Sequence, residues 1–210
     1  NIANLGTHTV SYVPLARGPT VYNGVYDIPV GYAVSQGVLT NTTATASYRG
    51  AGRPESMFLI ERLVDIAARE IGIDRILLRQ LNMIPETDIP YTNAFDVTYD
   101  SGVFSESMAR AMALVDWNGF KLRQRAAKKE GRLIGIGLAN YIETATGYPH
   151  ERAEMEILPN GQVDLVIGTQ SSGQGHETSY AQVVSEWLGV PFDSIVLRTG
   201  NTDFVSAGSG

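Results

Sequence analysis

The spacing of apolar residues predicts helices in the middle of the chain. From Pro54 onward, apolar residues recur every three or four positions, and Glu61, Asp65 and Arg69 fall on the other side, as in an amphipathic helix. The apolar positions are Leu59, Ile60, Leu63, Val64, Ala67 and Ile71. A proline in the first turn and Gly72 after the last apolar residue are typical of helix ends. Shorter helices are predicted over residues 74–82, 105–115 and 120–130.

Alternation of apolar with other residues predicts strands in the last third of the chain. Residues 134–142 alternate large aliphatic side chains with mostly small ones, which predicts a strand with one face of small residues. Residues 153–157 and 163–167 alternate similarly around a proline-asparagine-glycine turn, so they predict a β-hairpin. A helix over about 178–188 and a strand near 194–198 follow.

The first part of the chain has a different pattern. It is rich in valine, tyrosine and threonine, and its short extended runs are broken by Pro29 and Gly31, so we expect strands and loops with little helix. Taken together, the elements predict an α+β fold made of two small sheet-on-helix subdomains. We expect these subdomains over residues 1–131 and 132–210, with the boundary at Gly131.

Composition and charge exclude several classes of protein. A net charge of −6 disfavours a surface built to bind nucleic acid. No stretch approaches the roughly 20 apolar residues that a membrane span needs, and the start has no signal-peptide pattern. The absence of cysteine excludes disulfides, thiolate metal sites and thiol nucleophiles. We expect a cytoplasmic protein with no nucleic-acid partner and no membrane span.

A first glycine-rich loop precedes the long helix. It covers residues 47–55 and reads Ser-Tyr-Arg-Gly-Ala-Gly-Arg-Pro-Glu. Its glycines would let the backbone approach a ligand closely, and the helix start that follows favours negative charge. Its arginines, Arg49 and Arg53, can donate paired hydrogen bonds to anionic oxygens. The alternative is an ordinary strand-to-helix turn with solvated arginines, and the residues alone leave both interpretations open.

A second glycine-rich loop, residues 168–178, lies between the predicted hairpin and a helix. Its serine, threonine, glutamine and histidine side chains, with amides freed by glycines, form a natural cradle for phosphate or a polar heterocycle. It lacks the lysine of a phosphate-binding loop and the third glycine of a dinucleotide fingerprint. The alternative is a loop in which Thr178 caps the helix and His176 is solvated.

The sequence gives little support for a histidine metal site, a serine nucleophile or a carboxylate base. His8, His150 and His176 are far apart in the sequence and lack the paired spacing of metal ligands. No serine lies in a nucleophile-elbow sequence. Glu143 and Glu177 could act if buried, but exposed carboxylates are far more common. We therefore assign neither a metal ligand nor a catalytic base.

Several short motifs occur in a fixed order along the chain. They are Thr40-Asn41-Thr42-Thr43, Ser47 to Glu55 with the helix through Asp74, Tyr99-Asp100-Ser101-Gly102, Gly135-Ile136-Gly137, and Ser172 to Thr178. In this order they resemble the large subunit of the xanthine dehydrogenase, aldehyde oxidase and aerobic carbon monoxide dehydrogenase family of molybdenum hydroxylases. The resemblance extends over essentially all 210 residues.

The resemblance implies a cofactor and residues that contact it. The cofactor is molybdopterin with molybdenum, which we expect in the cytosine dinucleotide form. By resemblance, Arg49, Gly50 and Ala51 pass beside the molybdenum. The residues expected to contact the pterin and its pyrophosphate are Gln174, Gly175, His176 and Thr178.

The resemblance also implies an activity and partners. The activity is hydroxylation of an aldehyde or an N-heterocycle with water as the oxygen source. The expected partners are an iron–sulfur small subunit with 2Fe–2S clusters, an FAD-binding medium subunit or equivalent domains, and the remainder of the large subunit. We expect a dimer of heterotrimers.

The chain departs from the family pattern in two ways, one affecting the expected metal site and the other the expected catalytic residues. Carbon monoxide dehydrogenases with a molybdenum–copper site ligate copper through a cysteine in the first loop, whereas this chain has Gly50-Ala51-Gly52 and no cysteine. This favours a hydroxylase, or a carbon monoxide dehydrogenase-like subunit without that site. The upstream glycine-rich loop and the downstream loop with the family's essential glutamate are also missing.

The ends of the chain suggest an internal fragment. The chain opens on Asn1 and closes on residues 206–210, a run of small residues typical of a loop interior. Because the expected catalytic glutamate is outside the chain, we expect the fragment alone to be inactive. The rival interpretation is a noncatalytic anion-binding remnant of the same fold.

Overall fold

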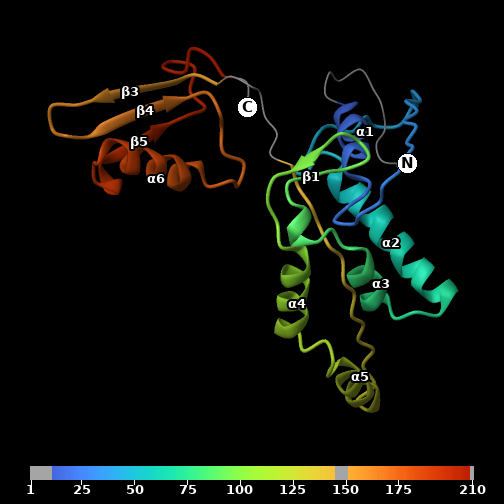
Figure 1. The fold of residues 1–210 in the computed structure, drawn as a ribbon. Coiled ribbons are helices and arrows are strands. Elements are labelled where there is room, and N and C mark those ends of the chain that lie inside the picture. Colours follow the sequence, from blue (N-terminus) through green and yellow to red (C-terminus); the bar gives the residue numbers. More distant parts are fainter. Residues whose placement is uncertain (1–10, 145–150, 209–210) are drawn as a thin grey trace. The chain divides into compact units, whose positions relative to one another are not determined.

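The computed structural model describes residues 11–144 and 151–208, and it contains two compact units, residues 1–144 and 145–210. Each unit combines helices with short strands, which confirms the α+β class (Figure 1). The units divide after Thr144 because residues 134–142 contact the helices of the first unit. As a boundary between subdomains of a longer protein, Gly131 stays a prediction.

Helices dominate the first unit, and the helices that the sequence predicted are present. A proline in the first turn and a left-handed Gly72 bound the longest helix, as expected. The Asp74 carboxylate caps the next helix by accepting hydrogen bonds from the amides of Ile76 and Leu77, at 2.8 and 3.0 Å. The helices are α1 (Val13–Arg17), α2 (Arg53–Ile71), α3 (Arg75–Asn82), α4 (Phe104–Leu114) and α5 (Phe120–Lys129).

The prediction of strands before residue 48 was wrong for the described residues 11–48. They form α1, a 3-10 helix η1 (Pro19–Val21) and loops, and Tyr26 makes a single bridge with Met83. The extended run that contains Val30 and Tyr32 has no neighbouring strand in the described part of the chain, and both side chains are exposed. Extended backbone without a hydrogen-bonded neighbour is not a strand.

Two very short strands were not predicted. Strands β1 (Tyr91–Thr92) and β2 (Thr98–Tyr99) pair antiparallel, and Tyr99 reaches the core. Asn93 closes the loop between them by accepting hydrogen bonds from the amides of Phe95 and Val97, at 2.9 and 3.0 Å. The spacing of apolar residues does not reveal this turn, because a polar side chain, and not a run of alternating residues, holds the two short strands together.

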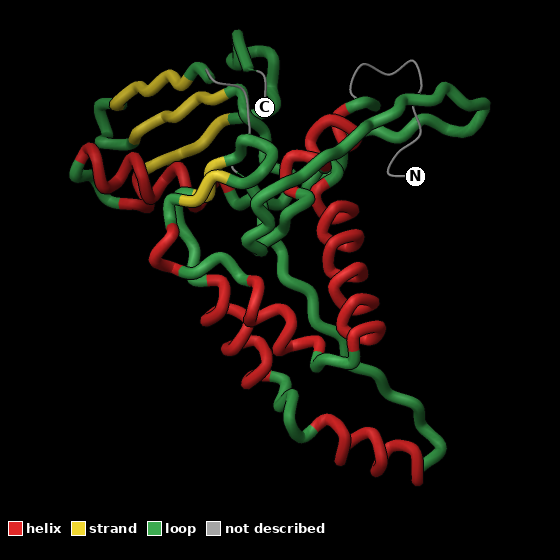
Figure 2. Tube along the Cα trace, turned by 45° about the vertical axis from the view of Figure 1, so that its right-hand side comes forward, coloured by secondary structure: helices red, strands yellow, loops and turns green. Residues whose placement is uncertain are grey.

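The predicted alternation over residues 134–142 is present, but the predicted strand is not. The segment is extended and appears as loop throughout (Figure 2). Ile142 is buried, whereas Gly135, Gly137 and Ala139 are exposed. Side chains take the place of a neighbouring strand at three carbonyl oxygens. Gln124 donates to Ile134 at 3.1 Å, Arg75 to Ile136 at 3.1 Å, and Arg79 to Leu138 at 3.4 Å.

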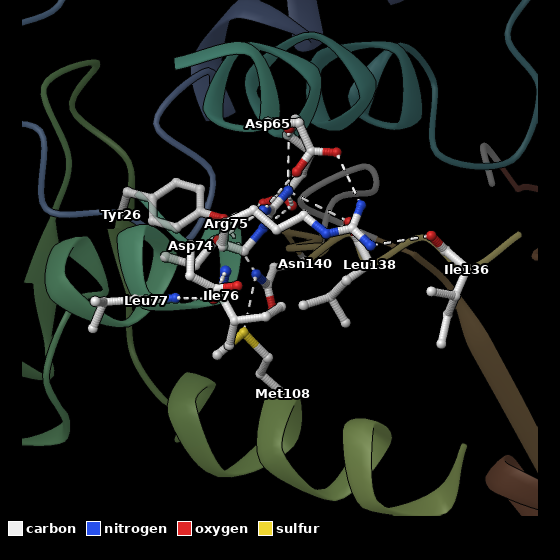
Figure 3. Close-up of polar contacts among 12 residues, drawn as sticks. Tyr26, Asp65, Asp74, Arg75, Ile76, Leu77, Met108, Ile136, Leu138 and Asn140 are labelled. Carbon is white, nitrogen blue, oxygen red and sulfur yellow. Dashed lines mark hydrogen bonds and ion pairs between the residues drawn. The ribbon is translucent and has the colours of Figure 1, made fainter. Parts of the chain in front are cut away.

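A buried arginine, Arg79, joins α2, α3 and this extended segment. Figure 3 shows Asp65 of α2 and Leu138 of the segment among the polar contacts of this region. The Arg79 side chain has no exposed surface, and its Nη2 atom lies 2.8 Å from a carboxylate oxygen of Glu61, which is 5% exposed. Its Nη1 atom lies 2.8 Å from Asp65. Glu61 and Asp65 had been placed on the polar side of α2, but they face inward because Arg79 neutralises them.

Tyr26 and Asn140 extend the same network. The Tyr26 hydroxyl donates to the second Glu61 oxygen, and the Asn140 amide donates to that hydroxyl at 3.2 Å. Burial and the Glu61 carboxylate raise the pKa of Tyr26. Burial alone would lower the pKa of Arg79, but the carboxylates of Asp65 and Glu61 outweigh it and raise that pKa. The Arg79 guanidinium therefore stays charged and the Tyr26 hydroxyl stays protonated at neutral pH.

The second unit contains the predicted hairpin, helix and strand. Strands β3 (Ala153–Ile157) and β4 (Val163–Ile167) pair antiparallel, and β4 pairs in parallel with β5 (Ile195–Arg198). Helix α6 (His176–Leu188) connects β4 to β5. Val163, Leu165 and Val184 form the buried core between sheet and helix.

Replacing Arg79 by alanine tests the buried network. The change leaves the Glu61 carboxylate buried without its counter-charge, so we expect the free energy of unfolding of the first unit to fall by about 3–5 kcal/mol. Urea unfolding followed by Trp117 fluorescence measures this loss. The exposed Trp187 of the second unit is replaced by phenylalanine in every sample, so that Trp117 alone reports.

Arg110→Ala is the matched control, because Arg110 pairs with Glu106 on the surface of α4. We expect that variant to lose less than about 1 kcal/mol. Equal effects of the two substitutions would contradict the structural role given to Arg79.

Candidate functional site

The first glycine-rich loop forms a tight turn immediately before α2. Gly50, Ala51 and Gly52 have consecutive positive φ angles of 89°, 46° and 98°. The Ala51 amide donates to the Tyr48 carbonyl oxygen at 2.7 Å, and the Arg53 amide donates to the Gly50 carbonyl oxygen at 3.0 Å. The chain thus reverses within three residues, and Ala51 adopts a conformation that is costly for a residue with a side chain.

Both glycines of this turn are required by their surroundings. A Cβ atom on Gly52 would lie 2.2 Å from the carbonyl oxygen of Pro14. One on Gly50 would lie 2.7 Å from the Pro54 ring and 3.2 Å from the hydroxyl of Tyr141. The turn is therefore fixed by close packing as well as by backbone conformation.

A cavity of about 360 Å³ lies beside this turn, and Tyr48, Arg49, Ala51 and Glu55 are part of its wall. Arg49 is exposed, and no hydrogen bond or ion pair engages its guanidinium within the described residues. Its donors remain available to an anionic ligand. Helix α2 begins at the same place, so its dipole adds positive potential.

The second arginine of the loop points inward. Arg53 is 3% exposed, its Nη1 atom donates to the Gly50 carbonyl oxygen at 3.3 Å, and its Nε atom lies 2.8 Å from a carboxylate oxygen of Glu143. The Tyr141 hydroxyl donates to the other Glu143 oxygen at 2.6 Å. Burial and the Glu143 carboxylate raise the pKa of Tyr141 to about 12, so its hydroxyl remains a donor at neutral pH.

These contacts revise two expectations from the sequence. Arg53 is a buried structural residue and not a solvated arginine or a free anion ligand. Glu143 is paired with it and is not a free carboxylate. Sequence reasoning missed Tyr141 altogether. One signal was available in the sequence. Tyr141 and Glu143 are two residues apart, so in an extended chain their side chains lie on the same side, opposite the buried Ile142.

The second glycine-rich loop leads directly into α6. Gly173 and Gly175 have positive φ angles of 104° and 75°, and Gly175 is the N-cap residue with no side-chain capping bond. The side-chain oxygen of Gln174 accepts hydrogen bonds from the amide and the hydroxyl of Ser172. This leaves the amide group of Gln174 as an outward donor on an exposed loop.

Helix α6 begins two residues earlier than predicted, which changes the roles of two side chains. Thr178 is not the cap, because it lies within the first turn and its amide donates to the Gly175 carbonyl oxygen at 3.0 Å. The His176 ring stacks on Tyr180 with centroids 4.7 Å apart. His176 is thus not simply solvated, and its Nδ1 atom is buried without a hydrogen-bond partner among the described residues.

The start of α6 therefore has the properties of an anion site. Apart from the Thr178 amide, which bonds to the Gly175 carbonyl oxygen, the first amides of α6 (His176 and Glu177) have no carbonyl partner within the helix, and no side chain caps them. A buried ring nitrogen without a partner is costly unless a ligand or water satisfies it. Glu177 is exposed in the first turn. The loop fits a ligand with phosphate oxygens and polar ring atoms.

The predicted site residues fall into two groups, one in each unit. Residues 49–51 form the turn of the first unit, and residues 174–178 form the start of α6 in the second. Within each unit the predicted residues lie together. The meeting of the two loops at one ligand stays a prediction. His8 and His150 lie outside the described residues.

Two family models match the chain, one over residues 1–83 and one over residues 110–210, and both are described as a molybdopterin cofactor-binding domain. The chain belongs to this molybdopterin-binding family. Together the two matches include both glycine-rich loops.

Members of this family with known activities are similar along most of the chain. The nicotine 6-hydroxylase large subunit of Paenarthrobacter nicotinovorans is 33% identical over 199 residues, which is 89% of this chain and 24% of that subunit. The carbon monoxide dehydrogenase large chain of Afipia carboxidovorans is 34% identical over 209 residues, covering 90% of this chain and 26% of the relative. This member of the family thus spans about a quarter of its curated relatives.

A solved structure agrees with the sequence relatives. Quinoline 2-oxidoreductase from Pseudomonas putida 86 superposes on 97% of this chain and 28% of its own chain with a TM-score of 0.82, at 31% sequence identity. In the described part of this molybdopterin-binding chain, no helix is long and apolar enough to cross a membrane.

Gly52→Ala tests the packing of the first loop. A methyl group at this position would collide with the Pro14 carbonyl oxygen, and the positive φ adds backbone strain, so we expect a loss of more than about 2 kcal/mol from the free energy of unfolding. Urea unfolding of the chain measures it.

Gly137→Ala is the control, since a Cβ atom there would meet nothing within 4 Å. That variant should unfold at nearly the wild-type urea concentration. A Gly52→Ala protein as stable as Gly137→Ala would show that the turn is not held as described.

Proposed function

We propose that the two glycine-rich loops hold the molybdenum–pterin cofactor of an oxidoreductase large subunit. The observation that carries the proposal is the start of α6, where uncapped helix amides and the unpartnered Nδ1 atom of His176 occur in a molybdopterin-binding domain. Both features suit an anionic heterocyclic ligand, because each lacks a partner that such a ligand would supply.

The two loops would have different roles. Gln174, Gly175, His176 and Thr178 would bind the pterin and its pyrophosphate through helix amides and side-chain donors. Residues 49–51 would pass beside the molybdenum, with Arg49 offering its unengaged guanidinium and the close Gly50–Gly52 backbone leaving space for the ligand. A cytosine dinucleotide form of the cofactor would bring two phosphates, which matches this supply of donors.

The bound cofactor would supply the two-electron oxidation by which an aldehyde or N-heterocycle is hydroxylated with oxygen from water. The residues of this chain would orient that cofactor and hold its negative charge. They would not act as the base, since Glu143 is paired with Arg53 and Glu177 is exposed. An N-heterocyclic substrate is favoured because two relatives are named for nicotine and quinoline.

The absence of cysteine argues against a molybdenum–copper centre, although two relatives are carbon monoxide dehydrogenase large chains. Gly50 and Ala51 occupy the turn in which that centre would need a thiolate. Hydroxylation is therefore proposed in place of carbon monoxide oxidation.

We place this chain within a longer large subunit that supplies the catalytic glutamate, together with an iron–sulfur subunit and an FAD-binding subunit that remove electrons. A dimer of such heterotrimers in the cytoplasm is the expected assembly. The chain by itself would not turn over substrate.

Metal and pterin analysis of the intact, mature protein tests the proposed function. We expect stoichiometric molybdenum and the fluorescence of oxidised pterin. A mature sample with neither would instead favour the noncatalytic remnant of the same fold. Assay with N-heterocycles, aldehydes and carbon monoxide, using an artificial electron acceptor, then distinguishes the possible substrates.

Replacing Gln174 or His176 by alanine in the intact protein tests the second loop. Each change removes a polar partner from a preorganised anion site, so we expect molybdenum and pterin content to fall several-fold. Gln182→Ala, at an exposed position on the same helix, is the control and should retain full content. Full content in both loop variants would rule out this role for the loop.

A further inference from the structure

The end of the extended segment, residues 141–144, contacts the first glycine-rich loop. Tyr141 and Glu143 contact a turn that lies some ninety residues earlier in the sequence. The Arg53 guanidinium is the connection, because its Nη1 atom donates to the Gly50 carbonyl oxygen at 3.3 Å while its Nε atom lies 2.8 Å from Glu143. The turn is therefore attached to the segment by an arginine inside the protein.

Both oxygens of the Glu143 carboxylate are engaged in this contact. One faces the Arg53 Nε atom and also accepts from the Thr144 amide at 3.1 Å. The other accepts from the Tyr141 hydroxyl at 2.6 Å. That hydroxyl would lie 3.2 Å from a Cβ atom on Gly50, so it packs directly on the turn. The three side chains and the turn form one packed cluster.

The turn needs such support from outside. Ala51 is held at a φ of 46°, between two glycines that also have positive φ, and few backbone bonds stabilise this arrangement. Strained backbone persists only where the surrounding structure fixes it. Arg53 is 4% exposed at its side chain, so its charge also requires a partner at close range. Glu143 meets both needs, although it is itself 43% exposed.

We propose that Glu143 and Tyr141 are positioning residues, which act through Arg53 to hold the Gly50–Gly52 turn in the form that presents Arg49 to the cofactor. This inference rests on the proposed function for the role of the turn. Both residues lie outside the two glycine-rich loops and act through Arg53, not through contact with the cofactor.

Amide hydrogen exchange in the intact protein tests this role. The Ala51 and Arg53 amides are bonded within the turn, so their exchange reports its opening. In Glu143→Gln, we expect both amides to exchange about tenfold faster or more, because the ion pair between Arg53 and Glu143 is lost. Tyr141→Phe removes only one hydroxyl and should give a smaller increase at the same two amides.

The Leu78 amide and an exposed glutamate provide the controls. The Leu78 amide donates to Asp74 within α3 and should keep its wild-type exchange rate, which separates local loosening from loss of the whole unit. Glu130→Gln removes a carboxylate from the exposed pair with Arg132 and should leave the turn unchanged. Tyr32→Phe, at an exposed tyrosine, is the control for Tyr141→Phe.

A second measurement connects the turn to the cofactor. In Glu143→Gln, we expect a changed Mo(V) electron paramagnetic resonance spectrum, a signal that Glu130→Gln should not move. Unchanged exchange at Ala51 and Arg53 in both test variants would overturn the positioning role, whatever the wild-type protein binds. Wild-type protein without molybdenum would overturn the proposed function instead, even if the turn loosens as expected.

Discussion

The packing of the first unit depends on the ion pairs that the buried Arg79 guanidinium makes with α2. This guanidinium neutralises Glu61 and Asp65 on α2, and it donates to the carbonyl oxygen of Leu138. A fully buried charge is tolerated only with close counter-charges and hydrogen bonds, and here α2, α3 and the extended segment each provide some of them. The geometry of one side chain thereby specifies how three separate parts of the chain pack.

That packing has a consequence at the candidate site. Because Leu138 and Ile136 are anchored by arginines of α3, the segment continues along the first unit and ends where Tyr141 and Glu143 meet the loop before α2. The same helix, α2, begins at that loop and contributes Glu61 two turns later. The buried polar network and the Gly50–Gly52 turn are thus connected by a short length of chain.

The sequence predicted those features that depend on local spacing and failed for those that depend on distant partners. Helices α2 to α6 and the β3–β4 hairpin follow from apolar periodicity, helix ends and turn residues, and the two glycine-rich loops follow from their composition. Glu61 appeared to be a surface residue because nothing local reveals that Arg79 lies opposite. Residues 134–142 appeared to be a strand because alternation shows which side is buried, but not whether another strand is present. The role of Tyr141 was missed because its contact with Gly50 joins residues that are about ninety positions apart in the sequence.

A crystal structure of the intact, mature protein, with anomalous scattering measured at the molybdenum edge, shows whether the two glycine-rich loops hold the cofactor. We expect an anomalous peak beside residues 49–51 and pterin phosphates in contact with the amides at the start of α6. We also expect a hydrogen-bond partner for the Nδ1 atom of His176. A cofactor that touches neither loop, or a mature protein whose loops contact only solvent, would contradict this role of the loops.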